Sequence, residues 1–301
     1  MNSFHANGKL LISGEYVVLD GALALAIPTK KGQFLQFEPT NHSILHWKSL
    51  DENKNLWLEV KFNPNDLEII ESTDIVKAEK LKTILKKAIE LNNQPTLING
   101  LITTQLEFPL EWGLGSSSTL ISCIAQWLNI DPYELHFGVS NGSGYDIACA
   151  ENSSSITYQV ADKKPITTTI NWNPSFHGSL FFVYLNRKQK SDIEVNRFIN
   201  NTKNINTATT INNISEITSS IINCNQLLAF NSLIEEHEKI MSRLLNLPTI
   251  KESDFPDFNG SIKSLGAWGG DFILATGDNE ERAYFKKKGF NTIIEFKDMV
   301  K

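Results

Sequence analysis

The sequence predicts a two-domain α+β protein, and three observations lead to this class. The length of 301 residues suits two domains of about 100–200 residues each. Alternating apolar residues over 33–37 and 56–62 indicate a mostly antiparallel sheet near the N-terminus. The C-terminal end reads as a glycine-rich turn, a strand, a helix and a strand, an order that favours an α+β second domain. These elements are predicted at 272–276, 280–288 and 292–296.

A polar stretch at 161–165 marks the predicted boundary between the domains. We therefore expect an N-terminal domain over 1–165 and a C-terminal domain over 166–301. The fully apolar stretch at 179–185 is expected to be a buried strand of the second domain.

Helices are predicted from apolar spacing and from capping residues. Apolar residues recur at helical spacing over 74–91, and the unbroken apolar run over 119–128 is typical of a buried helix. Asp131 followed by Pro132 predicts a short helix, because Asp caps helices well and Pro suits the first helical position. In the second domain, the Asn/Thr-rich stretch 200–213 is expected to be a solvated connection. The other helices are expected at 191–200, 214–228 and 232–245.

The charge of the chain argues against a nucleic-acid partner. It carries 34 acidic and 28 basic side chains, for a formal charge of −6, and only four of the basic residues are Arg. A nucleic-acid binder would normally show a basic, Arg-rich patch. The acidic run inside the helix predicted at 232–245 is interpreted as a solvated face. This run consists of Glu235, Glu236, His237 and Glu238.

The compartment is inferred from cysteines and apolar runs. The three scattered cysteines form neither a disulfide framework nor a metal knuckle, which favours a reducing compartment. No apolar run approaches the ~18–20 residues of a membrane helix, and the N-terminus lacks the pattern of a signal peptide. We therefore expect a cytoplasmic protein without a membrane partner, either a monomer or a homodimer.

The strongest chemical signal is a glycine- and serine-rich loop that leads into the helix predicted at 119–128. Glycines let the backbone approach a ligand, and successive N–H groups at a helix start can bind an anion. The serine hydroxyls add donors, and one of them could ligate magnesium. A serine-capped helix after a glycine turn is the alternative interpretation. The loop consists of Gly113, Leu114, Gly115, Ser116, Ser117 and Ser118.

Standard phosphate and hydrolase motifs do not match the chain. The pair Gly8-Lys9 lacks both the glycine five residues earlier and the following Ser or Thr of a P-loop. The glycine pairs near 113 and 142 lack the third glycine of the dinucleotide fingerprint. Ser143 lacks the glycine two residues earlier that a nucleophile elbow needs, which disfavours a serine hydrolase.

Four segments in this order resemble the motifs of the GHMP kinases, the family of galactokinase, homoserine kinase, mevalonate kinase and phosphomevalonate kinase. We name them the first motif, the central motif, the S-G-x-D turn and the third motif. They lie at 7–19, 113–118, 142–146 and 263–271. The resemblance implies the two-domain GHMP kinase fold, with an N-terminal mixed α/β sheet domain and a C-terminal ferredoxin-like α+β domain. It also implies ATP and Mg²⁺ as cofactors and a small-molecule acceptor.

The resemblance assigns roles residue by residue. The central motif, Gly113 to Ser118, would wrap the ATP phosphates, with Ser117 as a magnesium ligand. Asp146 would be the base or orienting group for the acceptor, and Lys9 would neutralise charge on the transferred phosphoryl group. The positions implied to bind the acceptor are Glu15, Ser143, Gly144, Gly266, Gly269 and Gly270.

Two departures from the family pattern affect these expectations. Trp268 replaces a small residue of the third motif, so we expect it to narrow the site or to stack on a ligand. Many members carry a magnesium-binding glutamate on a longer helix before the S-G-x-D turn, where this chain has only Glu134 at a shortened spacing. The metal would otherwise rest on Ser117, phosphates and water.

The acceptor is expected to be phosphomevalonate. Tyr16 follows Gly14-Glu15, whereas mevalonate kinases usually have histidine after that Gly-Glu. A basic turn after the strand at 179–185 could grip a phosphorylated acceptor, or could be a solvated turn. The alternatives are mevalonate kinase and a ligand-binding protein of this fold without catalysis. The basic turn contains Arg187, Lys188 and Lys190.

Overall fold

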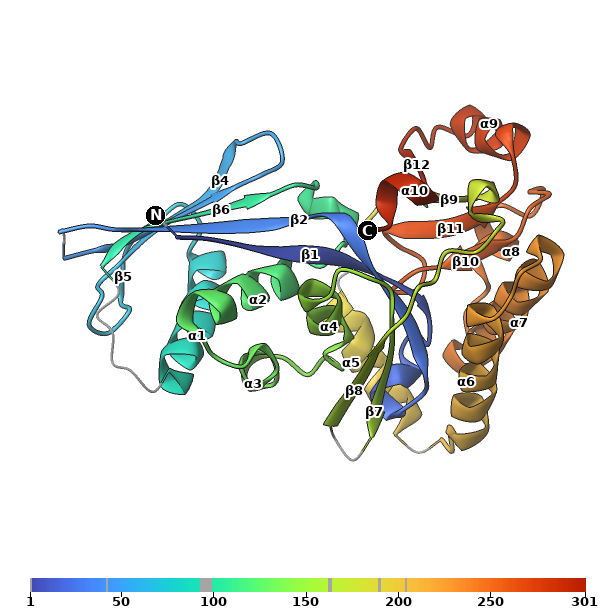
Figure 1. Ribbon diagram of the computed structural model, residues 1–301, viewed down its shortest axis with the longest axis horizontal. Helices are drawn as coiled ribbons and strands as arrows, with labels where there is room; N and C mark the ends of the chain where they lie inside the picture. Colours follow the sequence, from blue (N-terminus) through green and yellow to red (C-terminus); the bar gives the residue numbers. More distant parts are fainter. Residues whose placement is uncertain (1, 42, 93–98, 162–163, 189–190, 204) are drawn as a thin grey trace. The chain divides into compact units, whose positions relative to one another are not determined.

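The computed structural model describes the chain except for residues 1, 42, 93–98, 162–163, 189–190 and 204. The described chain forms two compact units (Figure 1). The first unit comprises residues 1–8, 31–110 and 114–151, and the second comprises 9–30, 111–113 and 152–301. The units thus interleave along the sequence, whereas the predicted boundary at residue 165 divides the chain once. That boundary stays a prediction.

The first unit is built on a sheet with helices against one face (Figure 1). The strand order is β5-β4-β3-β6-β2, and β1 pairs with β2. The β3–β6 pair is parallel, whereas β2–β6, β3–β4 and β4–β5 are antiparallel. The predicted mostly antiparallel sheet is therefore confirmed. The strands are β1 (Asn2–Ser13), β2 (Ala24–Pro39), β3 (Leu45–Leu50), β4 (Leu56–Phe62), β5 (Ile69–Ser72) and β6 (Gly100–Leu106).

The helices of the first unit begin largely where the sequence predicts. Asp74 caps the first of them by accepting from the Lys77 N–H at 3.1 Å. Asp131 caps another through the N–H groups of Tyr133 and Glu134, with proline in the first position, as predicted. The helix predicted from residue 119 begins earlier because Gly115, in the left-handed conformation, turns the chain directly into it. The helices are α1 (Ile75–Leu91), α2 (Ser116–Leu128), α3 (Pro132–Val139) and α4 (Tyr145–Glu151).

The core of the first unit lies between the sheet and these helices. Strand residues such as Trp47, Val60 and Ile102 are buried against helix residues such as Leu85 and Ile124. The strands β3 and β6 alternate between buried and half-buried positions, as one-sided burial of a sheet requires.

The second unit contains a four-stranded antiparallel sheet in the order β10-β11-β9-β12. Along the chain, a strand, helices, two strands, a helix and a final strand follow one another. This β-α-β-β-α-β sequence with that strand order is ferredoxin-like, so the predicted C-terminal architecture is confirmed. The strands are β9 (Leu180–Tyr184), β10 (Ile262–Ser264), β11 (Phe272–Thr276) and β12 (Ile293–Glu295).

A second group of strands in this unit extends the long strand β2. The start of β2 pairs with β7 (Ile156–Ala161), which pairs with β8 (Lys164–Thr169), both antiparallel. Short 3₁₀ turns occur at Val17–Asp20, Leu110–Trp112 and His177–Ser179. The α-helices are α5 (Ser191–Thr202), α6 (Ala208–Ile222), α7 (Leu227–Leu245), α8 (Ile250–Asp254), α9 (Asn279–Lys287) and α10 (Phe296–Met299).

The predicted connection over 200–213 is wrong in its second half, where α6 begins at Ala208. The missed part, 208–213, is rich in Asn and Thr, and its Ile211 is partly buried. The buried stripe of α6 follows within the helix predicted from residue 214. Ile214, Thr218 and Ile221 are its buried residues. Packing of this stripe, rather than propensity, therefore accounts for the helix.

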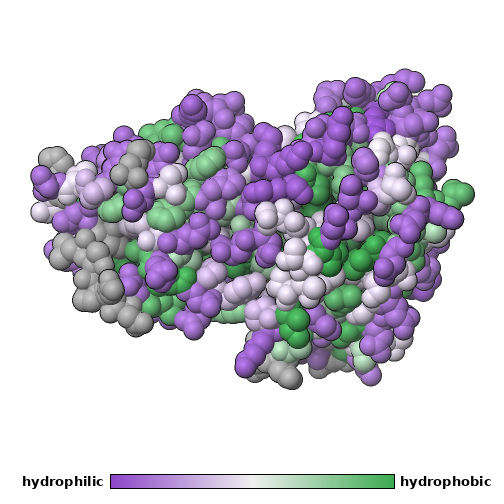
Figure 2. Space-filling view, viewed as in Figure 1, coloured by the Kyte–Doolittle hydropathy of each residue, from purple (hydrophilic) through white to green (hydrophobic). Residues whose placement is uncertain are grey.

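Hydrophilic side chains make up much of the face shown in Figure 2. Among the described residues, no helix combines the length and the apolar character that crossing a bilayer requires.

Candidate active site

The first motif reaches the second unit through the end of β1. The chain turns at Gly14, whose φ is +94° and where a Cβ would lie 2.8 Å from the Cβ of Ala24. Conformation and space therefore both require glycine there. Five residues earlier, Lys9 Nζ donates to the carbonyl oxygen of Gly113 at 3.0 Å. Lys9, the predicted charge-neutralising residue, thus contacts the first residue of the central motif.

The third motif forms the turn between β10 and β11. Gly266 and Gly269 have φ of +71° and +81°, which other residues rarely adopt. Around Gly266, the space that a Cβ would enter is open. Gly266 and Gly269 are half-buried, whereas Gly270 is buried, so the turn offers open space for a ligand at Gly266.

A set of buried contacts joins the first motif to the third motif inside the second unit. Lys263 Nζ lies 2.5 Å from Glu15 Oε1, and both side chains are almost fully buried. The residue after Glu15 also contacts the third motif. The Tyr16 hydroxyl oxygen accepts from the Trp268 N–H at 2.8 Å. Burial raises the pKa of Tyr16 to about 12, so this phenol stays protonated at neutral pH.

Helix α7 contributes two further titratable groups to this junction. Lys263 Nζ also lies 3.1 Å from Glu238 Oε1, and Ser264 Oγ donates to Glu238 Oε2 at 2.9 Å. His237 Nε2 accepts from the Gly14 N–H at 3.2 Å. Together, these contacts form a buried network of Glu15, His237, Glu238 and Lys263.

The predicted solvated face of α7 is wrong for two of its four residues. His237 is 0% exposed and Glu238 is 3% exposed, whereas Glu236 is exposed. Both buried residues lie on the stripe that Ile234 and Met241 also occupy, at spacing that faces one side of a helix. A charged composition conceals this stripe because its partner, Lys263, is distant in the sequence.

Burial and mutual charge set the protonation of the buried network. Burial raises the pKa of Glu15 to about 7, and the Lys263 charge only partly opposes this. The pKa of Glu238 is likewise raised by burial, and that of His237 lies well below its usual value for the same reason. Burial alone would lower the pKa of Lys263, but the two carboxylates raise it. Lys263 is therefore charged and His237 neutral at physiological pH.

The Trp268 side chain lies in the core, where it is not placed to stack on a ligand; that it narrows the acceptor site stays a prediction. Its side chain is 6% exposed and lies in an apolar cluster with Tyr16, Phe198 and Met241. The indole Nε1 donates to the Pro248 carbonyl oxygen at 3.0 Å. The bulky residue is tolerated because the turn directs it into the core.

Asp271, the last residue of the third motif, lies against the start of the central motif. A Cβ on Gly113 would be 2.1 Å from Asp271 Oδ2, and the Gly113 φ of +64° also favours glycine. Backbone hydrogen bonds hold Asp271, which donates to the Arg187 carbonyl oxygen and accepts from the Leu185 N–H. Asp271 had no role of its own in the prediction beyond its place in the third motif, and the structure places it beside Gly113.

The rest of the central motif belongs to the first unit and leads into α2. Gly115 has φ of +91° and no side chain with which to cap the helix. Ser118 Oγ is buried and donates to the Gly115 carbonyl oxygen at 2.9 Å, and the Leu114 side chain is in the core. Ser117 is exposed and Ser116 is half-buried. The motif therefore offers an anion its backbone and the hydroxyls of Ser116 and Ser117.

The S-G-x-D turn leads into α4 in the same unit. Gly144 has φ of +87°, and Ser143 is buried. Asp146 is half-buried in the first turn of α4, where Oδ1 accepts from the Ile147 N–H at 3.1 Å. This contact orients the carboxylate on a rigid element.

No protein-family model and no curated protein matches the sequence. Solved structures match nearly its whole length at low identity. Phosphomevalonate kinase from Streptococcus pneumoniae, solved with phosphomevalonate and AMPPNP, matches with a TM-score of 0.71 and 16% identity over 97% of this chain and 99% of that one. Mevalonate kinase from L. major, solved with R-mevalonate, gives a TM-score of 0.67 and 15% identity over 97% of this chain and 94% of that one. Galactokinase from Lactococcus lactis, solved with galactose, gives a TM-score of 0.68 and 12% identity over 95% of this chain and 87% of that one.

The chain has the GHMP kinase fold. Within the second unit, the first motif contacts the third motif through Tyr16 and Trp268. The central motif begins in the same unit at Gly113, which Lys9 contacts. The S-G-x-D turn and the remainder of the central motif belong to the first unit.

Carboxylates are sparse around the predicted metal ligands of this GHMP kinase fold. Glu134 is exposed in the first turn of α3. The described residues contain no group of three or more His, Cys, Asp or Glu side chains that could hold a metal ion. Of the predicted basic turn, Arg187 pairs with Asp254 at 2.7 Å, and Lys190 lies outside the described residues.

A histidine beside the S-G-x-D turn was not predicted from sequence. His136 on α3 is 3% exposed, and a Cβ on Gly142 would lie 3.1 Å from its Nε2. Neither ring nitrogen has a hydrogen-bond partner in the described part of the chain. His136 lies four residues before Ser140, and nothing in this position indicates that the side chain is buried.

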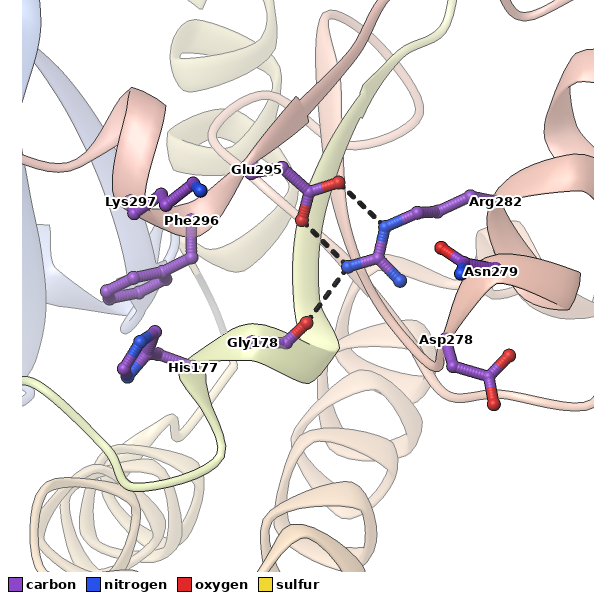
Figure 3. A pocket seen from close by; sticks show the side chains of 8 residues that line it. All are labelled: His177, Gly178, Asp278, Asn279, Arg282, Glu295, Phe296 and Lys297. Atoms are coloured by element: carbon purple, nitrogen blue, oxygen red, sulfur yellow. Dashed lines mark hydrogen bonds and ion pairs between the residues drawn. The ribbon is translucent and has the colours of Figure 1, made fainter.

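A cavity of about 450 Å³ in the second unit contains none of the predicted site residues (Figure 3). Arg282 forms two 2.7 Å contacts with Glu295 and donates to the Gly178 carbonyl oxygen at 3.0 Å. Asp278 caps α9. The charges of these three residues thus serve internal contacts. The cavity is lined by His177, Gly178, Asp278, Asn279, Arg282, Glu295, Phe296 and Lys297.

Proposed function

We propose that the chain is an ATP-dependent small-molecule kinase of the GHMP family. One observation carries the proposal. Lys9 Nζ contacts the Gly113 carbonyl oxygen at 3.0 Å, so the predicted catalytic lysine adjoins the loop predicted to bind the ATP phosphates. The GHMP kinase fold supports the same reaction class.

The chemistry of phosphoryl transfer suits this arrangement. The reaction depends mainly on positioning and on stabilising charge over the transferred group. The backbone from Gly113 to Ser117 would bind phosphate oxygens at the start of α2, whose N–H groups favour anions. Lys9 would add a positive charge at the head of that loop.

The donor set fits a magnesium ion that is bound mostly by phosphate oxygens. Ser117 offers an exposed hydroxyl, and the described residues provide no cluster of acidic ligands. Mg²⁺ often keeps several waters and binds substrate phosphates with few protein ligands. When bound, it would neutralise phosphate charge. Glu134 stays a less favoured ligand because its spacing before the S-G-x-D turn is shorter than the family pattern.

Asp146 would act on the acceptor. Its carboxylate is oriented by the Ile147 N–H and stays half-buried, which suits a group that accepts a proton or orients a hydroxyl. With a phosphorylated acceptor, whose attacking oxygen is already anionic, orientation is the main role. Ser143 and Gly144 of the first unit, and Gly266, Gly269 and Gly270 of the second unit, stay proposed acceptor-binding residues.

We propose phosphomevalonate as the acceptor, with mevalonate as the alternative. Tyr16 supports the first choice, because its hydroxyl anchors the third motif through Trp268 where mevalonate kinases usually have histidine. The solved enzyme from Streptococcus pneumoniae, bound to phosphomevalonate and AMPPNP, shares the fold over 97% of this chain. A ligand-binding protein without catalysis is the remaining alternative, favoured by the sparse carboxylates.

A coupled ADP-release assay with Mg²⁺ and ATP tests this proposal against phosphomevalonate, mevalonate, homoserine and galactose. We expect turnover with phosphomevalonate and its loss in Lys9→Met. Lys164→Met, which removes an exposed lysine of β8, is the matched control and should keep full activity. ATP binding without turnover on any acceptor would contradict a kinase acting on these four compounds and would favour a non-catalytic binder.

A further inference from the structure

We propose that Lys263 is a positioning residue of the kinase site, an inference that rests on the proposed function. Its buried ammonium ties the loop 14–16 of the first motif to the glycine-rich turn 265–271 of the third motif. It thereby holds the turn in the shape that binds a ligand, without touching the ligand itself.

The contacts of Lys263 exclude direct ligand binding. The side chain is 0% exposed. Its Nζ lies 2.5 Å from Glu15 Oε1, 3.1 Å from Glu238 Oε1 and 2.7 Å from the Ser264 carbonyl oxygen. These three acceptors match the three hydrogens of an ammonium group. The predicted acceptor-binding role of Glu15 is therefore better replaced by a role through Lys263.

The glycine-rich turn is anchored at three places, and Lys263 organises the first. Glu238 bonds both Lys263 and the next residue, Ser264, at the start of the turn. In the middle, the Trp268 N–H donates to Tyr16. At the end, Asp271 is held by backbone hydrogen bonds. Anchoring matters here because the turn contains two left-handed glycines, whose backbone is the most costly to order.

The loop 14–16 depends on the same network. The Gly14 N–H donates to His237 Nε2, so this nitrogen is the unprotonated one of a neutral imidazole. Glu15 Oε2 lies 3.2 Å from the same nitrogen. The Gly14 N–H already occupies the lone pair of this nitrogen, so an ionised Glu15 sets an acceptor against an acceptor, and protonation of Glu15 removes that repulsion. The loop should therefore be sensitive to the protonation of Glu15.

Four titratable groups face one another at this point, from three elements. Glu15 comes from the loop after β1, His237 and Glu238 come from α7, and Lys263 comes from β10. Burial raises the pKa of Glu15 to about 7. Above that pH the buried network carries one more negative charge, so we expect acceptor binding to change across neutral pH.

A purely structural ion pair is the competing explanation. Removing one member of a buried pair leaves an uncompensated charge, so Lys263→Met alone can fail to fold. The triple variant Lys263→Met, Glu15→Gln, Glu238→Gln removes the charges together and avoids that problem. Lys251→Met is the matched control, because Lys251 of α8 bonds Glu235 and Gly260 outside the buried network.

Two readouts separate positioning from stability. The first is ¹⁹F NMR of protein labelled with 5-fluorotryptophan, in which Trp268 reports on the turn and Trp47 on the core of the first unit. The second is steady-state kinetics with KM measured separately for ATP and the acceptor, between about pH 6 and pH 8. Lys263→Arg tests rescue by a retained charge.

We expect the triple variant to unfold cooperatively and to keep the Trp47 signal. Its Trp268 signal should shift or broaden, and its acceptor kcat/KM should fall about 10²-fold, as a misplaced turn predicts, with ATP KM little changed. Lys263→Arg should recover part of the loss, and Glu15→Gln should flatten the pH dependence of acceptor KM. Unchanged Trp268 and acceptor values in the folded triple variant would overturn the inference. If the wild type turns over no acceptor, the proposed function fails, yet the Trp268 comparison still decides whether Lys263 holds the turn.

Discussion

The motifs of the second unit differ from those of the first unit in how fully their side chains are bonded within the chain. Glu15 and Lys263 in the second unit are buried and paired with each other. In the first unit, Ser117 is exposed and Asp146 is half-buried. A polar side chain that is exposed or half-buried can reach a ligand, whereas a fully buried, bonded group can act only through its neighbours. The comparison separates residues that we expect to contact ligands from residues that position them.

Asp146→Asn should give the largest effect on turnover and tests the ligand-contacting side of this comparison. With mevalonate, loss of a general base should lower kcat by about 10²-fold or more. With phosphomevalonate, whose attacking oxygen is already anionic, the loss should be smaller. Steady-state kinetics with both acceptors measure the difference. An unchanged rate with an active alcohol acceptor would refute a catalytic Asp146.

Gly115→Val should abolish ATP binding. The left-handed φ of +91° at Gly115 disfavours a β-branched residue, and a side chain there would obstruct the phosphate binding that we propose for this loop. Titration calorimetry with ATP measures the loss. Gly178→Ala is the control, because a Cβ at Gly178 meets nothing within 4 Å. Normal ATP affinity in the folded Gly115 variant would rule out phosphate binding at this loop.

Two neighbouring serines sharpen the comparison within a single motif. Ser117→Ala should weaken Mg²⁺-dependent activity and leave the melting temperature unchanged, since Ser117 is exposed. Ser118→Ala should lower stability by about 1 kcal/mol, because it removes the hydrogen bond to the Gly115 carbonyl oxygen. Magnesium titrations of activity and thermal melts of both variants distinguish these outcomes. If Ser118→Ala lost Mg²⁺-dependent activity and Ser117→Ala lost stability, the assignment of the metal contact to Ser117 would be wrong.

Glu15→Gln should change the pH dependence of stability. Burial raises the pKa of Glu15 from 4.5 to about 7, so the folded chain holds a proton that the unfolded chain has lost. The stability due to this proton is complete below pH 4.5 and disappears as the pH rises through about 7, in total about 3 kcal/mol. The variant should therefore gain stability relative to wild type between about pH 5 and pH 8. Parallel melting curves across that range would refute a buried, titrating Glu15.

Much of the fold could be predicted because its signals are local. The strand Phe272–Thr276 follows from an apolar run, and the helix start at Asp131 follows from a single capping residue. The start of α6 at Ala208 could not be predicted, because residues 208–213 are rich in Asn and Thr and precede the buried stripe that begins at Ile214.

The candidate site was predicted where a motif carries the information and missed where a distant partner carries it. Gly115 and Gly266 were expected in special turns, and both have left-handed backbones. The burial of Glu238 was not predicted, because its compensating charge lies 25 residues away on Lys263, in another element. Trp268 was misassigned because its direction depends on the conformation of the turn.

The central claim is that this chain transfers the γ-phosphoryl group of ATP to a small molecule. ³¹P NMR of the wild-type chain with Mg²⁺, ATP and phosphomevalonate tests it most directly. The claim predicts loss of the γ-phosphate signal of ATP together with the appearance of ADP and of a new diphosphate on the acceptor, at equal rates. A bound but intact ATP with each of the candidate acceptors would contradict it.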